Sequence, residues 1–158
     1  MNSTEVEIKP FTPKDADAFR ILNEEWITTY FGMEEEDHFQ LNDPESHILK
    51  PGGQIFMAFL NGAPVGCCAL IPMKAGVFEL AKMAVAPGFQ GHGIGRKILA
   101  HTIHEARRRG MKRLFLGSNS KLGSAVHLYE SFGFRHLKPE EIPPSPYARA
   151  NVFMELDL

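Results

Sequence analysis

The stretch Gln90-Gly91-His92-Gly93-Ile94-Gly95 decides the fold of this chain, because it joins a strand-like run to a helix-like run. The run before it, 77–85, is short and apolar. Glycines at such a corner let the backbone approach a ligand, since no Cβ stands in the way. The first helical turn adds unpaired N–H groups and a partial positive charge, so the corner predicts a phosphate site. Apolar residues then recur at the spacing of one helix face, at Ile94, Ile98, Leu99, Ile103 and Ala106.

The composition predicts one soluble globular domain over residues 1–158. Hydrophobic residues make up 44% and charged residues 23% of the chain, which is typical of globular proteins, and the length suffices for one core rather than two. The net charge of −2 does not favour nucleic acid, which calls for a basic surface. No apolar run reaches about 18 residues, so we expect no membrane partner.

The N-terminus and the cysteines indicate the compartment. The first residues lack a basic stretch followed by an apolar one, so no secretory signal is expected. Cys67 and Cys68 are adjacent and would point to opposite faces of a strand, where a disulfide between them would be strained. They indicate reduced packing residues, and we expect a cytoplasmic protein.

The remaining segments predict the fold class. Strands are expected at 6–11, 54–60, 64–71, 77–85, 113–118 and 151–156, with a tight turn at Asn61-Gly62. Helices are expected at 13–29, 34–41 and 124–132 and after the glycine corner, with Gly133 ending the last. The fold class is α/β (α+β), with a mixed, mostly antiparallel sheet of about six to seven strands and helices on both faces. The first helix is expected to bury Ala18, Ile21, Leu22 and Trp26.

Two familiar phosphate-binding motifs do not fit the glycine corner. A Walker loop needs Lys followed by Ser or Thr, and neither pair follows Gly95. A dinucleotide fingerprint needs glycine where Arg96 stands, and it normally belongs to the first strand–helix unit, whereas three or more strands are expected before this one. A third interpretation, a tight turn without a ligand, stays open.

Three motifs follow one another between residues 77 and 134. Met83-Ala84-Val85-Ala86-Pro87 ends the strand, the glycine corner contains Gln90, Gly93 and Gly95, and 125–134 reads A-V-H-L-Y-E-S-F-G-F. Together they resemble the GNAT superfamily of acyl-CoA-dependent N-acyltransferases, whose motifs are Val-x-Pro, Arg or Gln-x-x-Gly-x-Gly or Ala, and A-x-x-L-Y-x-x-x-G-F. The chain departs from the family at Leu122, where many members have asparagine, and offers Asn119 instead.

The resemblance implies acetyl-CoA as cosubstrate and no metal. It implies that strands 77–85 and 113–118 splay at the coenzyme site, so that the pantetheine arm pairs with the first strand like an added strand. A backbone N–H there would stabilise the thioester oxygen, and the amides of the corner would face the pyrophosphate. The implied coenzyme-binding residues are Met83, Ala84, Val85, Gln90, Gly91, His92, Gly93, Ile94, Gly95, Arg96 and Asn119.

The resemblance also implies two catalytic residues. Tyr129 stands where the family usually has a tyrosine near the coenzyme sulfur, and its hydroxyl would act as general acid. Glu79 matches a glutamate that serves as general base in some members. The competing interpretations are a core aromatic for Tyr129 and a solvent-facing strand residue for Glu79. No cysteine is placed to carry an acyl group, so we expect direct attack by the amine.

Two charged clusters are assigned no catalytic or metal-binding role. His101 and His104 stand near Glu105, but a metal site needs more ligands and a buried face, and the arginines that follow favour a solvated helix end. The acidic run 34–37 attracts a cationic amine in one interpretation and is a solvated face in the other, which we favour.

The acceptor and the assembly remain open at this level. By fold analogy the acceptor site lies between the first helices and the last hairpin, and a small-molecule or peptide amine is expected. Monomer and homodimer are both compatible with the sequence. The alternative function is a non-catalytic acyl-CoA-binding or sensing module, and a dinucleotide-binding module is the third. The analogy names four lining residues, Trp26, Tyr30, Tyr147 and Arg149.

Overall fold

A mixed sheet runs through the computed structural model, which describes residues 5–158. The strand order is β1-β2-β3-β4-β5-β7-β6, and every neighbouring pair is antiparallel except β4 and β5. This seven-stranded sheet confirms the predicted fold class. The bounds are β1 (Val6–Pro10), β2 (Gln54–Leu60), β3 (Ala63–Pro72), β4 (Val77–Val85), β5 (Arg113–Ser118), β6 (Arg135–His136) and β7 (Val152–Asp157).

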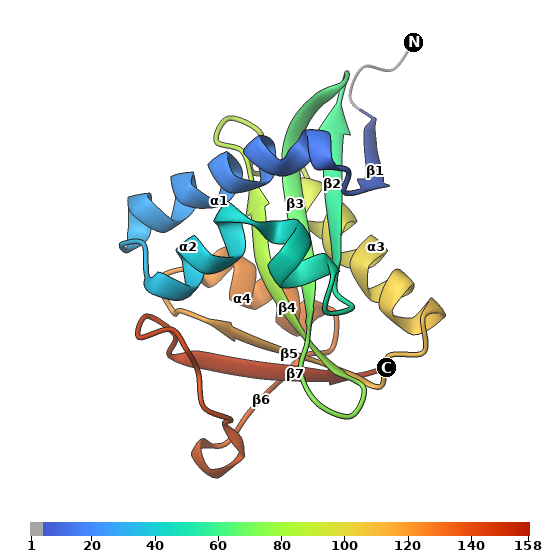
Figure 1. Cartoon of the computed structure of the whole chain (residues 1–158). Helices are drawn as coiled ribbons and strands as arrows, with labels where there is room; N and C mark the ends of the chain where they lie inside the picture. The colour runs from blue at the N-terminus through green and yellow to red at the C-terminus, as the bar shows by residue number, and fades with distance from the viewer. Residues whose placement is uncertain (1–4) are drawn as a thin grey trace.

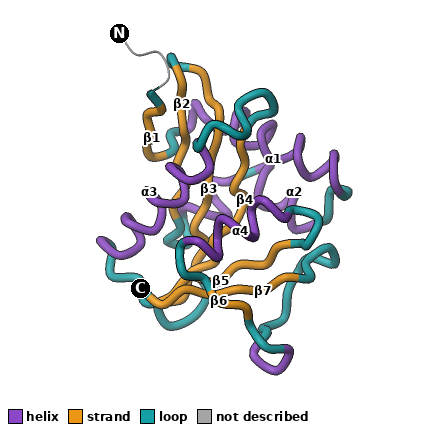
Figure 2. The backbone as a smooth tube through the Cα atoms, turned by 180° about the vertical axis from the view of Figure 1, so that it is seen from behind, coloured by secondary structure: helices purple, strands orange, loops and turns teal. Residues whose placement is uncertain are grey.

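Helices cover both faces of the sheet. Two of them, α1 and α2, lie on one face (Figure 1), and α3 and α4 lie on the other, which Figure 2 shows from behind. Within residues 5–158, no helix is long and apolar enough to cross a bilayer. The bounds are α1 (Ala16–Tyr30), α2 (Glu35–Asn42), α3 (Ile94–Arg108) and α4 (Gly123–Ser131), with shorter helical turns at Pro13–Asp15, Glu45–Leu49 and Pro139–Glu141.

The sheet separates two apolar clusters, and residues of the central strands alternate between them. In β2, Met57 packs with α1 and α2, whereas the preceding residue, Phe56, points to the other face and packs with α3. Cys67 and Cys68 enter opposite clusters, as predicted, and both are free thiols with no exposed surface. This period of two is what a strand buried on both faces requires.

The parallel pair β4 and β5 is joined along only part of its length. Pairing connects Val77, Phe78 and Glu79 with 113–115, while β5 continues along β7 as far as Ser118. Beyond Glu79 the two strands separate (Figure 1). The later residues of β4 therefore present main-chain groups without a strand neighbour on that edge.

A β-bulge interrupts β4 just after the separation. Ala69 pairs with Ala81, but Cys67 pairs with Ala84, so Cys68 faces two residues of β4. Lys82 lies in this bulge with φ of +55°. Such a φ is uncommon for a residue that carries a side chain, and bulges of this kind redirect the strand.

The buried face of α1 differs from the prediction. Leu22 is buried as expected, but Ile21 is 52% exposed, and Phe19, Asn23 and Ile27 are the residues of α1 with no exposed surface. The helix begins after a 3-10 turn over Pro13–Asp15, and it turns about 100° per residue. The sheet receives the face centred between Phe19 and Leu22, which places Ile21 toward solvent, so the prediction of a buried Ile21 was wrong.

The end of α4 confirms the predicted stop at Gly133. This glycine has φ of +95°, and its N–H donates to the Glu130 carbonyl at 3.0 Å, while the Phe134 N–H donates to the Tyr129 carbonyl at 3.1 Å. These two bonds make a Schellman cap. The cap fixes the last turn of α4, which carries Tyr129 into the apolar cluster.

Candidate active site

A cavity of about 630 Å³ opens where β4 and β5 separate. Its walls come from the end of α1, β4, the glycine corner, the start of α3, the end of β5, α4 and the segment before β7. His92 is exposed and lies outside these walls. The other predicted site residues all line the cavity: Trp26, Tyr30, Glu79, Met83, Ala84, Val85, Gln90, Gly91, Gly93, Ile94, Gly95, Arg96, Asn119, Tyr129, Tyr147 and Arg149. Their common location is a finding, and their individual roles stay predictions.

The glycine corner requires glycine at two positions for backbone reasons. Gly91 has φ of +83° and Gly93 has φ of +78°, a region that costs a residue with a Cβ about 1–2 kcal/mol. Among residues 5–158, and apart from the chain neighbours of each glycine, no heavy atom lies within 4 Å of where a Cβ would stand at either position. The amides of Ile94, Gly95 and Arg96 follow in the first turn of α3 and have no helical acceptor. Such a turn favours an anion.

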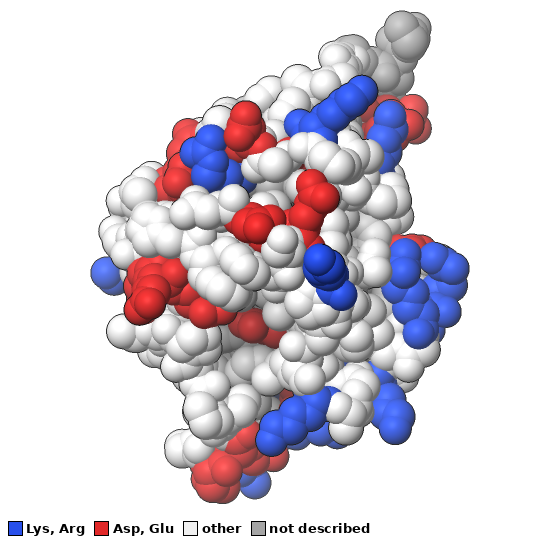
Figure 3. Space-filling view, in the orientation of Figure 1, with Lys and Arg blue, Asp and Glu red and all other residues white. Residues whose placement is uncertain are grey.

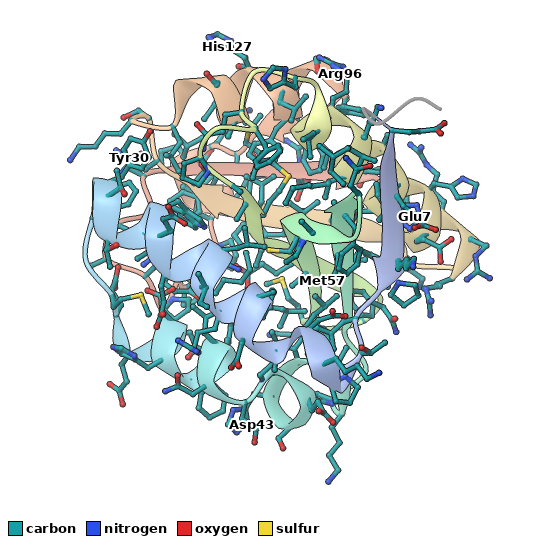
Figure 4. All side chains as sticks on the ribbon, turned by 90° about the horizontal axis from the view of Figure 1, so that it is seen from above. Glu7, Tyr30, Asp43, Met57, Arg96 and His127 are labelled. Atoms are coloured by element: carbon teal, nitrogen blue, oxygen red, sulfur yellow. The ribbon has the colours of Figure 1, made fainter. Side chains whose placement is uncertain are left out.

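Two basic side chains stand at the outer edge of the cavity. Arg96 on α3 and His127 on α4 lie at the same edge of the molecule and point outward (Figure 4). The Arg96 guanidinium lies 5.4 Å from the centre of the Phe132 ring and donates to the Ser131 hydroxyl at 3.4 Å. A cation is thus held beside the glycine corner.

The free edge of β4 is the second main-chain surface of the cavity. Met83, Ala84 and Val85 line it on the side away from β3. The Gln90 side-chain amide donates to the Val85 carbonyl at 3.2 Å, which joins the glycine corner to the strand. An extended ligand with amide groups is able to pair with such an edge as a strand would.

Tyr129 reaches the cavity from the apolar side. Its side chain is 7% exposed and its ring packs 5.7 Å from that of Phe134. Among the described residues, the Tyr129 hydroxyl has no hydrogen-bond partner. Every fully buried polar side-chain atom of these residues has one, so the hydroxyl is not fully buried and is open to the cavity. Burial, with a smaller contribution from Cys68, raises the pKa of Tyr129. The hydroxyl therefore stays protonated at neutral pH and is able to donate.

Glu79 is a carboxyl group among apolar neighbours. It pairs with Ile71 of β3 and Phe115 of β5, and it lines the cavity at the last position where β4 and β5 are joined. Burial raises the pKa of Glu79 to about 7, with Lys82 lowering it and Glu36 raising it further. A carboxyl group with this pKa exchanges protons readily near neutral pH.

A buried ion network lies on the α2 side of the cavity. Asp37 has no exposed surface, and its Oδ1 accepts a hydrogen bond from Lys82 Nζ at 2.6 Å. Arg149 donates to both Asp37 oxygens, at 2.6 and 2.8 Å. The Arg149 guanidinium also lies over the rings of Tyr147 and Trp26, at 4.5 and 5.6 Å. One carboxylate thus holds two cations.

This network corrects the interpretation of the acidic run. Acidic side chains do gather around α2 on this face (Figure 3), but Asp37 points inward rather than to solvent. Burial alone would raise the pKa of Asp37, but hydrogen bonds from Arg149 and Lys82 lower it to about 2. Asp37 is able to stay charged in the interior because Lys82 and Arg149 are its partners. It therefore does not belong to a solvated face.

Asn119 directly follows the end of β5. It is the asparagine that the sequence offers in place of the family asparagine missing at Leu122. Its Nδ2 donates to the Arg149 carbonyl at 2.6 Å, and its Oδ1 accepts from the Lys121 N–H at 2.8 Å. These bonds tie the segment before β7 to β5 and leave one amide hydrogen for a ligand. The predicted contact with the coenzyme stays a prediction.

Sequence reasoning missed Lys82 and the inward orientation of Asp37. The signal at Lys82 was a single cation within the apolar run Leu80-Ala81-Lys82-Met83-Ala84, which a buried strand tolerates only when the charge has a partner. The partner lies 45 positions earlier in the chain, and no local pattern identifies it.

Comparisons with known proteins agree with this geometry. The acetyltransferase (GNAT) family model matches residues 17–134. The uncharacterized N-acetyltransferase YjgM of Escherichia coli K12 is 27% identical over 119 residues, which cover 70% of this chain and 71% of that protein.

Solved structures share the fold over nearly the whole chain. A GNAT-family acetyltransferase from Staphylococcus aureus Mu50 has a TM-score of 0.88 at 24% identity, covering 97% of this chain and 99% of that one. The yncA protein of Salmonella typhimurium, solved with its cofactor acetyl-CoA, has a TM-score of 0.77 at 21% identity, covering 96% and 93%. Because the family model covers β2 to β5 and α1 to α4, this chain belongs to the acetyltransferase (GNAT) family.

Proposed function

We propose that the protein transfers the acetyl group of acetyl-CoA to a primary amine by direct attack. One observation carries the proposal: the free edge of β4, the glycine corner, Tyr129 and Glu79 all open into a single cavity. Main-chain amides for a phosphate, a strand edge for an amide-rich arm, an acid and a base are the parts that this transfer needs.

The coenzyme has a natural orientation in this cavity. Its pyrophosphate would lie on the amides from Gln90 to Arg96, and its pantetheine arm would pair with Met83, Ala84 and Val85. The solved yncA structure, which shares the fold, carries acetyl-CoA. The thioester would then lie near the bulge, with its carbonyl oxygen toward a main-chain N–H of β4 that stabilises negative charge.

The chemistry divides between two groups. Glu79, with a pKa of about 7, takes a proton from the ammonium form of the acceptor. The neutral amine attacks the thioester carbon, and the nitrogen of the tetrahedral intermediate loses its second proton to solvent. The C–S bond then breaks, and Tyr129 donates its proton to the departing coenzyme sulfur. The proton held by Glu79 returns to Tyr129 through solvent, so the products are the acetylated amine and free coenzyme A. Trp26, Tyr30, Tyr147 and Arg149 would surround the acceptor.

The decisive experiment compares the parent protein with Tyr129→Phe. Release of coenzyme A is measured with acetyl-CoA and a panel of small amines, amino acids and peptides, while calorimetry measures acetyl-CoA binding. We expect turnover by the parent and a loss of roughly 10²–10⁴-fold in kcat for the variant, with acetyl-CoA binding unchanged.

Other outcomes have clear meanings. Binding of acetyl-CoA without turnover of any amine would favour the non-catalytic acyl-CoA-binding module. Absence of binding to acetyl-CoA and to coenzyme A would overturn both functions.

A further inference from the structure

The bulge of β4 is held from the β3 side by a thiol. Lys82 has φ of +55°, and a residue with a side chain stays in this region only where its surroundings hold it there. Its carbonyl, which the bulge removes from the ladder, accepts a hydrogen bond from the Cys67 thiol at 3.3 Å. The backbone of the bulge therefore has one specific support from the neighbouring strand.

The side chain of Lys82 provides a second support, toward α2. Only 2% of it is exposed, although it belongs to a residue that lines the cavity. Its Nζ donates to Asp37 Oδ1 at 2.6 Å and to the Tyr147 hydroxyl at 3.0 Å, and it lies 4.7 Å from the centre of the Tyr147 ring. A buried ammonium is stable only with partners of this kind.

Asp37 connects this ammonium to two other segments of the protein. Asp37 accepts hydrogen bonds from Nη1 and Nη2 of Arg149, which lies in the segment before β7. It also accepts one from the main-chain N–H of Glu34, at the start of α2, at 2.9 Å. The carboxylate is therefore shared by β4, α2 and the segment that ends in β7. Residues of β4 and of the segment before β7 line the cavity, whereas α2 lies outside its lining, so Asp37 links two cavity walls to a helix beyond them.

We propose that Lys82 is a positioning residue for acetyl transfer: its ammonium fixes the β4 bulge, and with it Glu79, against α2 and the Tyr147–Arg149 segment. The inference rests on the proposed function, which assigns Glu79 as the base. The Lys82 ammonium is held by two protein groups, Asp37 and the Tyr147 hydroxyl, and only 2% of its side chain is exposed, so its assigned role is support rather than contact with the reacting atoms. Its effect on transfer is exerted through the geometry and the field at Glu79.

The field at Glu79 makes the proposal measurable. The charged and titratable groups around this carboxyl are Lys82 on its own strand, Glu36 on α2 and Tyr147 before β7. Lys82 lowers the pKa of Glu79 and Glu36 raises it. Loss of the Lys82 charge should therefore move the titration of Glu79 to higher pH, an effect that a purely structural support would not have.

Two variants separate charge from contact. Lys82→Gln removes the charge but keeps a donor for Asp37, whereas Lys82→Met removes both, and Lys74→Met removes an exposed lysine from the β3–β4 turn as the matched control. Three readouts are used: carboxyl titration of Glu79 by ¹³C NMR, assigned with Glu79→Gln; amide hydrogen exchange at 83–85; and steady-state kinetics with the preferred amine.

The expected pattern is specific. In both Lys82 variants the Glu79 carboxyl titrates at higher pH than in the parent. Only in Lys82→Met do the amide hydrogens of 83–85 exchange faster. Lys82→Met lowers kcat roughly 10- to 100-fold, the range that misplacement of a catalytic group produces, while KM for acetyl-CoA changes less than about threefold because the glycine corner is untouched. The acid limb of the pH–rate profile moves upward with Glu79, and Lys74→Met matches the parent throughout.

Contrary results would overturn the proposal. Amide exchange in Lys82→Met at the parent rate would overturn it, and so would an unchanged Glu79 titration in either variant. If Lys82→Met does not fold, the Glu79 titration in Lys82→Gln decides alone. The NMR and exchange readouts need no turnover. A parent protein that acetylates no amine would therefore count against the proposed function while the assignment of Lys82 is still decided.

Discussion

Asp37 and Glu79 are carboxyl groups on either side of Lys82, and their surroundings shift their pKa values in opposite directions. Burial raises the pKa of Glu79 to about 7, and the nearby charge of Lys82 offsets only part of this rise. At Asp37, burial is outweighed by hydrogen bonds from Arg149 and Lys82, and the pKa falls to about 2. The same side-chain chemistry thus gives a proton acceptor at one position and a permanent anion at the other.

The proposed base predicts a specific pH dependence. Because Glu79 must be ionised to accept a proton, kcat should rise with pH and level off above about 7, the pKa of this group. Glu79→Gln should lower kcat by roughly 10²–10⁴-fold and remove that acid limb. The measurement is kcat from pH 5.5 to 9 at saturating substrates. An unchanged limb in the variant would assign the base to another group.

Loss of the Asp37 charge should destabilise the protein. Asp37→Asn leaves the buried Lys82 without an anion and leaves Arg149 with only Glu34, 3.4 Å away, which costs about 3–5 kcal/mol, as measured by urea unfolding at pH 7. The folded pKa of Asp37 is about 2, below the unfolded value of about 3.9. The stabilisation is therefore complete above about pH 4 and is lost as pH falls through 2, so the difference between parent and variant should shrink in that window.

A matched control is available on α1. Asp17 forms a 3.4 Å ion pair with Arg20 at the surface, with 87% of its side chain exposed. Asp17→Asn should change stability by less than about 1 kcal/mol. Equal effects of the two substitutions would contradict a buried, fully paired Asp37.

At the scale of elements, the parts governed by local signals were predictable. The bounds of β4 and β5 agree with the sequence pattern, α3 buries all five expected apolar residues, and the Asn61-Gly62 turn has φ of +52° and +80°, as the sequence of such a turn requires. The cavity lies where the glycine corner and the tyrosine motif indicated. Each of these depends on residues close together in the chain.

Features that depend on distant contacts were not predictable. The face of α1 that meets the sheet is decided by packing against β3 and β4, and the two-residue strand β6 exists only because β7 pairs with it. The bulge at Lys82 requires both the register with β3 and a carboxylate from α2. A sequence pattern contains no information on which of several acidic residues turns inward.

The corrected face of α1 predicts unequal costs along one helix. Phe19 has no exposed surface and packs 6.2 Å from Phe11 in an edge-on arrangement, whereas Ile21 is 52% exposed. Phe19→Ala should therefore cost about 3–5 kcal/mol, and Ile21→Ala should remain within about 0.5 kcal/mol of the parent. Denaturant unfolding of both variants is the measurement, and a larger cost at Ile21 would restore the face expected from the sequence.

At the scale of the whole molecule, the two parts of the sheet are joined along a short seam. Strands β1 to β4 form one part and β5, β7 and β6 the other, and in the part of the chain that the structure describes only Val77, Phe78 and Glu79 of β4 pair with β5. A coenzyme lying along the free edge of β4 would add contacts to both parts. Binding should therefore stabilise the folded protein as a unit.

This stabilisation is directly measurable. At a concentration of 100 times Kd, acetyl-CoA should add about 2.7 kcal/mol, which corresponds to a rise in Tm of about 5–10 °C for a chain of this size. NAD at the same concentration serves as the control and should leave Tm unchanged. A rise with NAD and none with acetyl-CoA would support a dinucleotide-binding module instead.

The two adjacent cysteines give this molecule an internal reporter. Cys67 and Cys68 face opposite layers, neither has exposed surface, and burial raises the pKa of both thiols, that of Cys68 to about 12. Alkylating reagents attack thiolates, so neither sulfur should react until its layer has opened. Iodoacetamide labelling, followed by mass spectrometry, would therefore time the opening of each layer separately, and equal rates at the two sulfurs would mean that both layers come apart in one event.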